Sequence, residues 1–340
     1  MAINPPAGPR DIGIIGTGSY LPGEAVSNSD VGALCGASEE WILRKTGITG
    51  RHYAAAHEAS SDLAVRAGAA ALADARTGPG GIGLIVVATS TPDHPQPATA
   101  CLVQDRLGAR AAAAFDLNSV CSGFVYALVA AAALLAADPR AGRALVIGVD
   151  VYSRIIDPAD RRTAVLFGDG AGAAVIGQVP PGRGLLGWRL DSHGEHHAMI
   201  GVEAGGSRTP ASSETVAGDR HRFRMDGRAV RRFIADELPA AIRALVADLE
   251  IAPEEIDHLI PHQANDVLLG EVFPSLGLRR ARMHRPVAAH GNTGAASIPV
   301  ALDLANRAGE LGHGDLVMLA GFGGGMSLGT ALLRWNAPRP

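Results

Sequence analysis

The stretch FDLNSVCSGFVYALVAAAALLAAD, residues 115–138, places one cysteine between a short apolar run and a helix with almost no polar face. The residues from Phe124 to Ala137 predict a helix that is buried all round. This run is too short to span a bilayer and ends at Asp138. Cys121 stands where the helix begins, so its thiol is either inert packing or a nucleophile, and the rest of the chain has to decide.

Composition bounds the answer. A chain of 340 residues, 47% hydrophobic and 19% charged, buries a large core and is long enough for two domains or two fused halves. A net charge of -4 gives no global basic field, so we expect neither nucleic acid nor an anionic membrane as a partner. The N-terminus has no charged segment followed by an apolar one, so we expect no secretory signal. Three cysteines without a CxxC pair favour a reducing cytoplasm over a disulfide framework or a zinc cage.

Apolar runs typical of strands alternate with Ala-rich helical segments, which predicts an α/β fold. Two prolines and a glycine at 180–182 interrupt the pattern, and we place a boundary there between the halves 1–178 and 179–340. The polar segment 202–222 is expected to form a long loop. Strands are expected at 11–18, 82–90, 143–151, 172–179, 258–263 and 315–323, and helices at 60–75 and 230–249.

The two halves carry an internal repeat. The run LVIG from Leu145 and the run LVML from Leu316 are offset by 171 residues, and the same offset carries Cys121 onto Asn292. In each half a strand leads into a sharp turn and then into an Ala-rich helix. If the copies pack about a pseudo-two-fold axis, the two helix N-termini present Cys121 and Asn292 to one cavity.

Five motifs in order resemble the β-ketoacyl-acyl-carrier-protein synthase III family of the thiolase superfamily, over residues 12–335. They read DLNSVCSGF, LFGDGAGAAV, PHQAN, HGNTGAASIP and GFGGGMSLGTALLRW. The resemblance implies a five-layered αβαβα fold built from two duplicated halves and a homodimer. It also implies a Cys-His-Asn triad, which falls on Cys121, His262 and Asn292.

Each member of this triad has a plainer alternative. A buried free cysteine usually acts as a small apolar side chain, but unpaired N–H groups and the helix dipole at Cys121 are expected to favour thiolate. Cys35 and Cys101 lack such a setting and are read as structural. His262 is otherwise a core histidine, and Asn292 is otherwise a turn residue between glycines. The paired repeat favours the functional reading of both.

The chemistry of acyl transfer explains these residue types. A thiolate accepts an acyl group from one thioester and surrenders it to a carbanion. Loss of CO₂ from a malonyl thioester puts negative charge on its oxygen, to which His262 Nε2 and the Asn292 amide would donate hydrogen bonds. A second oxyanion hole would use the backbone N–H groups of Cys121 and Gly324, since glycine permits close approach; a flexible turn is the alternative for these glycines. The resemblance places Phe322 beside the nucleophile, in the acyl pocket.

The resemblance also indicates where coenzyme A binds. The segment SEEWILRKTGI places Trp41 on the adenine, and ADRRTAVLFGDG adds Arg161, so that an aromatic face and a guanidinium enclose a purine. Lys45 stands where the family typically has an arginine, a point charge in place of a fork. Trp41 is alternatively a half-buried anchor of an amphipathic helix.

An arginine-rich run, DRHRFRMDGRAVRRF, is either a solvated face or a docking site for an acidic carrier protein and its phosphopantetheine. We expect Arg228, Arg231 and Arg232 to dock the carrier. The family usually has an arginine shortly after HQAN, where this chain has Asp266 and Val267, which leaves the acceptor open.

Two further motifs are set aside. GTGSYLPG begins like a dinucleotide fingerprint but has Leu21 at the third glycine position and no acidic partner after a following strand. HGEHH, residues 193–197, has no partner at metal-ligand spacing, so no metal site is expected.

The leading hypothesis is a condensing enzyme that starts fatty acid or polyketide chains. An acyl-CoA acylates Cys121, and a malonyl carrier protein then condenses with loss of CO₂. Coenzyme A thioester serves as substrate, and no permanently bound cofactor is expected. One alternative is an acyltransferase that acts without decarboxylation on a small acceptor. The other is a non-catalytic acyl-CoA-binding subunit, which covalent acylation of Cys121 would exclude.

Overall fold

The computed structural model describes residues 11–23 and 25–336; residues 1–10, where no secretory signal is expected, lie outside this part. A first five-stranded sheet has the order β1-β7-β6-β4-β5, with β1 antiparallel to β7, β7 antiparallel to β6, and β4 parallel to β6 and β5. Its strands are β1 (Ile12–Tyr20), β4 (Leu84–Ala88), β5 (Ala113–Leu117), β6 (Ala144–Val151) and β7 (Asp169–Gln178).

A second five-stranded sheet has the order β12-β11-β13-β14-β8. Here β11 is parallel to β12 and β13, while β13, β14 and β8 follow in antiparallel pairs. The two sheets therefore share one topology, and the duplication predicted from the sequence is confirmed. The strands are β8 (Gly184–Ser192), β11 (His258–Pro261), β12 (Arg282–Met283), β13 (Leu316–Gly323) and β14 (Ser327–Arg334).

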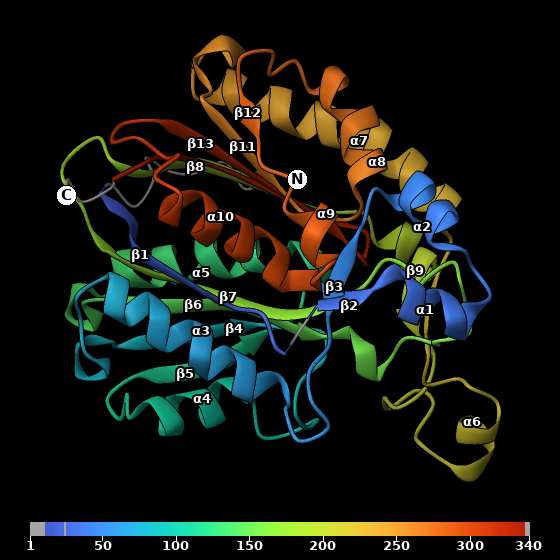
Figure 1. The fold of residues 1–340 in the computed structure, drawn as a ribbon. Coiled ribbons are helices and arrows are strands. Elements are labelled where there is room, and N and C mark those ends of the chain that lie inside the picture. The colour runs from blue at the N-terminus through green and yellow to red at the C-terminus, as the bar shows by residue number, and fades with distance from the viewer. Residues whose placement is uncertain (1–10, 24, 337–340) are drawn as a thin grey trace.

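Helices cover both sheets and fill the space between them (Figure 1). The central layer holds α5 (Gly123–Ala137) and α10 (Ser297–Arg307), whose side chains join one core with both sheets. α3 (Ser60–Asp74) and α4 (Thr99–Leu107) cover the outer face of the first sheet, and α7 (Gly227–Asp248) and α8 (Asp266–Val272) cover the second. The predicted five-layered αβαβα arrangement is confirmed.

The central helix α5 explains the apolar run of the sequence. Packed between two sheets, it has no face that needs polar side chains. Within the described residues, Val120–Ala137 is the one segment long and apolar enough to cross a membrane, and most of it is buried inside the protein. The strands on either side are also covered on both faces, which is why they read as continuous apolar runs.

The chain passes from the first sheet to the second between Gln178 and Gly184. Pro180 to Gly182 form the turn between them, with Gly182 at a positive φ of 77°. Because α5 and α10 share one core, the division into 1–178 and 179–340 stays a prediction.

The remaining elements surround one end of the layers. Between β9 and β10 the chain projects away from the layers and carries α6 (Figure 1), so the segment expected to be loop contains one short helix. These elements are β2 (Ala25–Ser27), α1 (Asn28–Cys35), α2 (Glu39–Thr46), β3 (Gly50–His52), β9 (Ile200–Val202), α6 (Ser213–Ala217), β10 (Phe223–Met225) and α9 (Val287–His290). Short 3₁₀ turns are η1 (Pro79–Gly81), η2 (Val120–Ser122), η3 (Pro139–Ala141), η4 (Tyr152–Arg154), η5 (Gly194–Met199), η6 (Pro253–Glu255), η7 (Phe273–Leu276) and η8 (Gly294–Ala296).

The two equivalent turns before α5 and α10 bend the backbone in the same way. Val120 has φ 49°, and Gly291, at the offset of 171, has φ 68°. Glycine adopts this left-handed region readily, whereas a β-branched residue is strained there. Strain of this kind gathers at functional sites, and Val120 directly precedes Cys121.

Candidate active site

A pocket of about 270 Å³ opens where the two halves meet, and it is lined from both of them. The structure brings Cys121, His262 and Asn292 into this pocket from turns that are far apart in the sequence. Cys121 comes from η2, His262 directly follows β11, and Asn292 precedes η8. Phe322, at the end of β13, lies among them with its ring 5.0 Å from that of His262 in an edge-on contact.

Cys121 is 7% exposed and closely packed. A Cβ on Gly323 would lie 2.7 Å from its backbone nitrogen, so only glycine fits at that position. Burial raises the pKa of the thiol strongly, and the buried carboxyl of Asp150 raises it further, while a hydrogen bond from Tyr152 lowers it. The expected thiolate is therefore wrong for the ligand-free protein, because desolvation outweighs the helix N-terminus.

His262 is 2% exposed, and burial lowers its pKa to about 3, so the imidazole is neutral. Its Nδ1 lies 2.7 Å from Oγ of Ser297, which accepts the backbone N–H of Gln263 at 3.2 Å. The hydroxyl hydrogen of Ser297 is thereby available to Nδ1, and the ring then carries its own hydrogen on Nε2. His262 is arranged as a hydrogen-bond donor.

The side chain of Asn292 is oriented in a similar way. Its Oδ1 accepts the backbone N–H of Gly294 at 2.9 Å, which commits the oxygen and leaves the amide NH₂ to donate. Its backbone N–H donates to the carbonyl of Leu166 at 2.8 Å, and its carbonyl accepts from Gly168 at 3.0 Å. The pocket therefore holds a thiol and two side-chain N–H donors, which suits stabilisation of a developing oxyanion.

Three aromatic rings close one side of the pocket. Tyr152 stacks on Phe167 with ring centroids 4.4 Å apart, and Phe223 meets both rings edge-on at 5.4 and 5.0 Å. All three line the pocket, and all three are buried. A bound acyl chain therefore meets a rigid aromatic wall.

The motif reading did not identify Ser297, Tyr152 or Asp150. Ser297 lies inside the quoted motif HGNTGAASIP, but only the fold shows that it reaches His262. Asp150 and Tyr152 follow the apolar run of β6, where side chains at strand ends often meet ligands. That position was the available signal.

Comparison with known proteins identifies the family. Residues 115–194 match the model described as 3-oxoacyl-[acyl-carrier-protein] synthase III, and residues 246–335 match its C-terminal model. Acetoacetyl CoA synthase NphT7 of Streptomyces sp. (strain CL190) is 52% identical, covering 95% of this chain and 98% of its own length. The chain belongs to the 3-oxoacyl-[acyl-carrier-protein] synthase III family.

Further synthase III relatives agree. The β-ketoacyl-[acyl-carrier-protein] synthase III of Desulfitobacterium hafniense (strain Y51) is 43% identical over 96% of this chain and 98% of its own length. The crystal structure of 3-oxoacyl-(acyl carrier protein) synthase III from Pseudomonas aeruginosa, 40% identical, superimposes with a TM-score of 0.88 over 97% of this chain and 100% of that one. A priming β-ketosynthase of a polyketide pathway, 31% identical, gives 0.89 over 97% and 98%.

The fold is therefore the thiolase fold, and the protein is a synthase III-type condensing enzyme, as the sequence predicted. Enzymes of this family act on thioesters of coenzyme A and of acyl carrier protein, in chain initiation for fatty acids or polyketides. They need no metal or permanent cofactor. Which acyl group and which malonyl thioester this synthase III takes is a separate question.

The mouth of the synthase III pocket holds the residues expected to bind coenzyme A. The guanidinium of Arg161 lies 5.4 Å from the ring centre of Trp41, and both line the pocket with Lys45. The structure thus brings an aromatic face and two cations together at one rim.

The expected carrier-docking residues are less uniform. Arg228, Arg231 and Arg232 are exposed at the start of α7, but only Arg231 lines the pocket. Arg231 is ion-paired with Glu271 of α8. Asp266, at the start of α8, is 3.2 Å from Arg285.

Gly324 is buried against Val120 and Ile200, next to Gly323, which lines the pocket. Its use as an oxyanion donor stays a prediction.

The two motifs set aside have structural explanations. Gly18 lies in β1, where a Cβ would overlap the backbone of Ala71 in α3, so the glycine permits helix–sheet packing. His193 and His196 pack their rings on Phe233, at 5.0 and 5.7 Å. Over residues 11–23 and 25–336, no group of three or more His, Cys, Asp or Glu side chains has the arrangement of a metal site.

Proposed function

We propose that this synthase III acylates Cys121 from a short acyl-CoA and condenses the acyl group with malonyl-CoA. The observation that carries the proposal is the meeting of the Cys121 thiol with the donor groups of His262 and Asn292 in one buried pocket. Such a pocket supplies both a nucleophile and an oxyanion hole.

The first half-reaction forms the acyl-enzyme. Sulfur of Cys121 attacks the thioester carbonyl, the S–C bond to coenzyme A breaks, and coenzyme A leaves as a thiolate that takes a proton from solvent. The backbone N–H groups of Cys121 and Gly324 would hold the tetrahedral oxyanion.

The second half-reaction forms the new carbon–carbon bond. The malonyl carboxylate leaves as CO₂, and its bonding electrons form an enolate whose oxygen receives hydrogen bonds from His262 and Asn292. The enolate carbon attacks the acyl-enzyme, and the thiolate of Cys121 departs. A neutral His262 suits this step, since it donates from Nε2 without acting as a base.

The aromatic wall favours a short primer. Tyr152, Phe167 and Phe223 pack on one another beside Cys121, so an acyl chain of a few carbons fits before it meets the rings. A longer chain would have to displace buried aromatic side chains, which is costly in a packed interior.

The rim favours malonyl-CoA over malonyl carrier protein. Val267 lines the pocket where the family usually has a docking arginine, and the charge of Arg231 is met by Glu271. Asp266 adds an acidic group that Arg285 only partly offsets. An acidic carrier finds few free cations here, whereas coenzyme A still finds Trp41, Lys45 and Arg161. The relative named acetoacetyl CoA synthase points the same way.

The test separates the two half-reactions. The protein is incubated with acyl-CoAs of increasing length and analysed by intact mass and peptide mapping, and malonyl-CoA or malonyl carrier protein is then added while CO₂ is measured. We expect acetyl on Cys121 and CO₂ release with malonyl-CoA. Release only with malonyl carrier protein would reject the proposed acceptor, and an acyl-enzyme that transfers to a small acceptor without CO₂ would favour the acyltransferase. The homodimer and the cytoplasmic location stay predictions.

A further inference from the structure

The buried thiol of Cys121 has to lose its proton before or during acylation. His262 is poorly placed to take it, because its Nδ1 is occupied by Ser297 and its Nε2 carries the hydrogen. The proton needs another acceptor within the buried part of the site.

A continuous line of polar atoms leads away from the sulfur. The hydroxyl of Tyr152 is hydrogen-bonded to the thiol of Cys121. The same hydroxyl lies 3.2 Å from Oγ of Ser90, and this Oγ lies 2.9 Å from Oδ1 of Asp150. Every gap in the line is a hydrogen-bond distance.

Asp150 at the end of the line is a fully buried carboxyl, 0% exposed. It accepts hydrogen bonds from Ser90, Thr91 and the backbone of Ala295, and these donors are all uncharged. Burial raises the pKa of Asp150, which makes it a better proton acceptor than an exposed aspartate. A negative charge there also opposes thiolate formation on Cys121 until Asp150 is neutralised.

We propose that Tyr152 and Ser90 relay the proton of Cys121 to Asp150 as the acyl group arrives, and relay it back when condensation releases the cysteine thiolate. The S–H bond breaks as a Tyr152 O–H bond forms, the former Tyr152 hydrogen passes to Ser90, and the former Ser90 hydrogen passes to Asp150. One proton is stored and returned in each cycle, so no added acid or base is consumed. After the first transfer Ser90 donates to Tyr152 and Tyr152 donates to sulfur.

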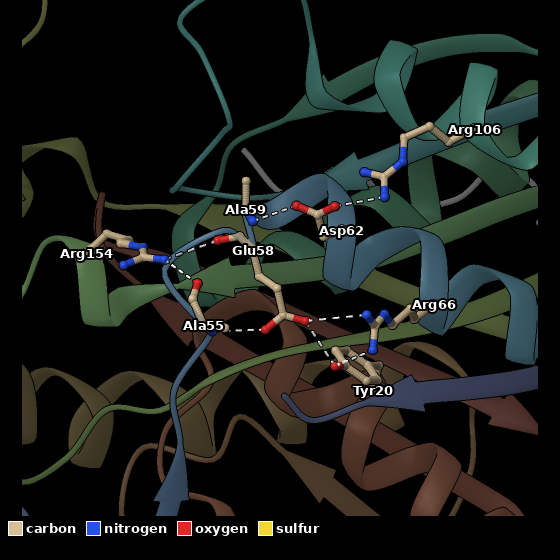
Figure 2. A network of polar contacts seen from close by, with 8 residues as sticks. All are labelled: Tyr20, Ala55, Glu58, Ala59, Asp62, Arg66, Arg106 and Arg154. Carbon is tan, nitrogen blue, oxygen red and sulfur yellow. Dashed lines mark hydrogen bonds and ion pairs between the residues drawn. The ribbon is translucent and has the colours of Figure 1, made fainter. Parts of the chain in front are cut away.

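Tyr152 suits this role because its position is fixed on both sides. Its ring stacks on Phe167, and the next residue, Ser153, donates to Asp169 through its N–H at 2.8 Å and its hydroxyl at 2.5 Å. Arg154 then binds the carbonyls of Ala55 and Glu58 (Figure 2).

The same network holds the loop that leads into α3. Glu58 accepts hydrogen bonds from Tyr20 and the backbone of Ala55, with Arg66 close by at 3.7 Å (Figure 2). The loop is thus firmly held, and η4, which begins with Tyr152, is anchored to it through Arg154. Burial also raises the pKa of Tyr152 well above its usual value, so its hydroxyl passes a proton on without becoming a phenolate.

This inference rests on the proposed acylation of Cys121, and its test includes a reaction that does not depend on the proposed substrates. Alkylation of Cys121 by iodoacetamide and acylation by acetyl-CoA are followed by mass from about pH 6 to about pH 9. In the wild type the proton moves within the site, so we expect both rates to change little with pH. In Tyr152→Phe, which keeps the ring, both rates should fall ~10²-fold near neutral pH and then rise about tenfold per pH unit.

Ser90→Ala tests the relay beyond the tyrosine. We expect it to show the same loss and the same pH dependence, and the double variant with Tyr152→Phe should be no slower than either single one. Tyr126→Phe, which removes another buried hydroxyl far along α5, is the matched control and should behave as wild type. Asp150→Asn adds a direct test where it folds, as judged by thermal unfolding.

Wild-type rates for Tyr152→Phe would overturn the relay, and so would a slow Tyr152→Phe beside an unaffected Ser90→Ala. If alkylation follows the expected pattern but no acyl-CoA acylates Cys121, the relay stands and the proposed function fails.

Discussion

Oγ of Ser297 lies 2.7 Å from Nδ1 of His262, and this contact determines what the histidine can do. With Nδ1 accepting from the hydroxyl, the other ring nitrogen carries the hydrogen and becomes a donor. Ser297 begins α10, directly after the turn that holds Asn292, so one short segment orients both proposed donors.

Replacing Ser297 by alanine should slow malonyl decarboxylation by ~10- to 100-fold, because the histidine then loses its fixed tautomer. Acylation of Cys121 should change little. The two half-reactions are measured separately, with Ser275→Ala, whose hydroxyl bonds a carbonyl in η7, as control. Equal losses in both half-reactions would contradict the assigned role.

His262→Ala and Asn292→Ala should each reduce malonyl decarboxylation by ~10²- to 10³-fold, the usual effect of removing an oxyanion donor. Both variants should still form the acyl-enzyme, which Cys121→Ala cannot. Burst measurements with acetyl-CoA check this division. It would be wrong if either variant acylates as poorly as Cys121→Ala.

Phe223→Leu should extend the range of primers, because it removes part of the aromatic wall beside Tyr152. We expect acyl-CoAs longer by two or more carbons to acylate Cys121 faster than in the wild type, with little change for acetyl-CoA. Phe233→Leu, in the separate core under α7, is the matched control for loss of a buried ring. An unchanged length profile would show that these rings do not limit the primer.

His284 gives a prediction for stability. Burial, with His258 beside it, lowers its pKa to about 4, from an ordinary value of 6.5. Below pH 6.5 the unfolded chain binds a proton that the folded protein refuses, so this contribution to stability is present above pH 6.5 and is lost as pH falls towards 4. In urea unfolding at pH 7 and pH 5, His284→Gln should lose less stability between the two pH values than the wild type. A steeper loss would reject this.

Val267→Arg should improve the use of malonyl carrier protein by lowering its KM, and more so at low salt, because it restores a rim cation. Arg232→Glu should raise that KM and leave acylation by acyl-CoA unchanged. Arg280→Glu, which does not line the pocket, controls for net charge. If carrier-protein kinetics stay constant while malonyl-CoA is used well, the carrier is not the natural acceptor.

The layers and the duplication could be predicted because buried strands leave continuous apolar runs and the turns are marked by glycine. The offset of 171 residues paired Cys121 with Asn292 for the same reason. The sequence alone could not show that Ser297 reaches His262, or that Ser90 meets Tyr152, since these contacts join segments 35 and 62 residues apart.

The state of Cys121 was mistaken for a related reason. A helix N-terminus is visible in the sequence, but the desolvation that opposes it depends on how five layers close over the sulfur. Likewise the pairing of Arg231 with Glu271 depends on how α7 packs beside α8, and it changes what a run of arginines means.

The strained turn at Val120 gives the duplication a division of labour. Both copies make the same bend, but the second makes it with Gly291, at little conformational cost, and the first makes it with a branched residue that also lines the pocket. The first copy therefore holds the reacting sulfur on a tense, restricted backbone, while the second carries the proposed hydrogen-bond donors on a relaxed one. Ancestral symmetry has given way to specialisation, in which one half keeps the nucleophile stiff and the other half remains the easier to fold.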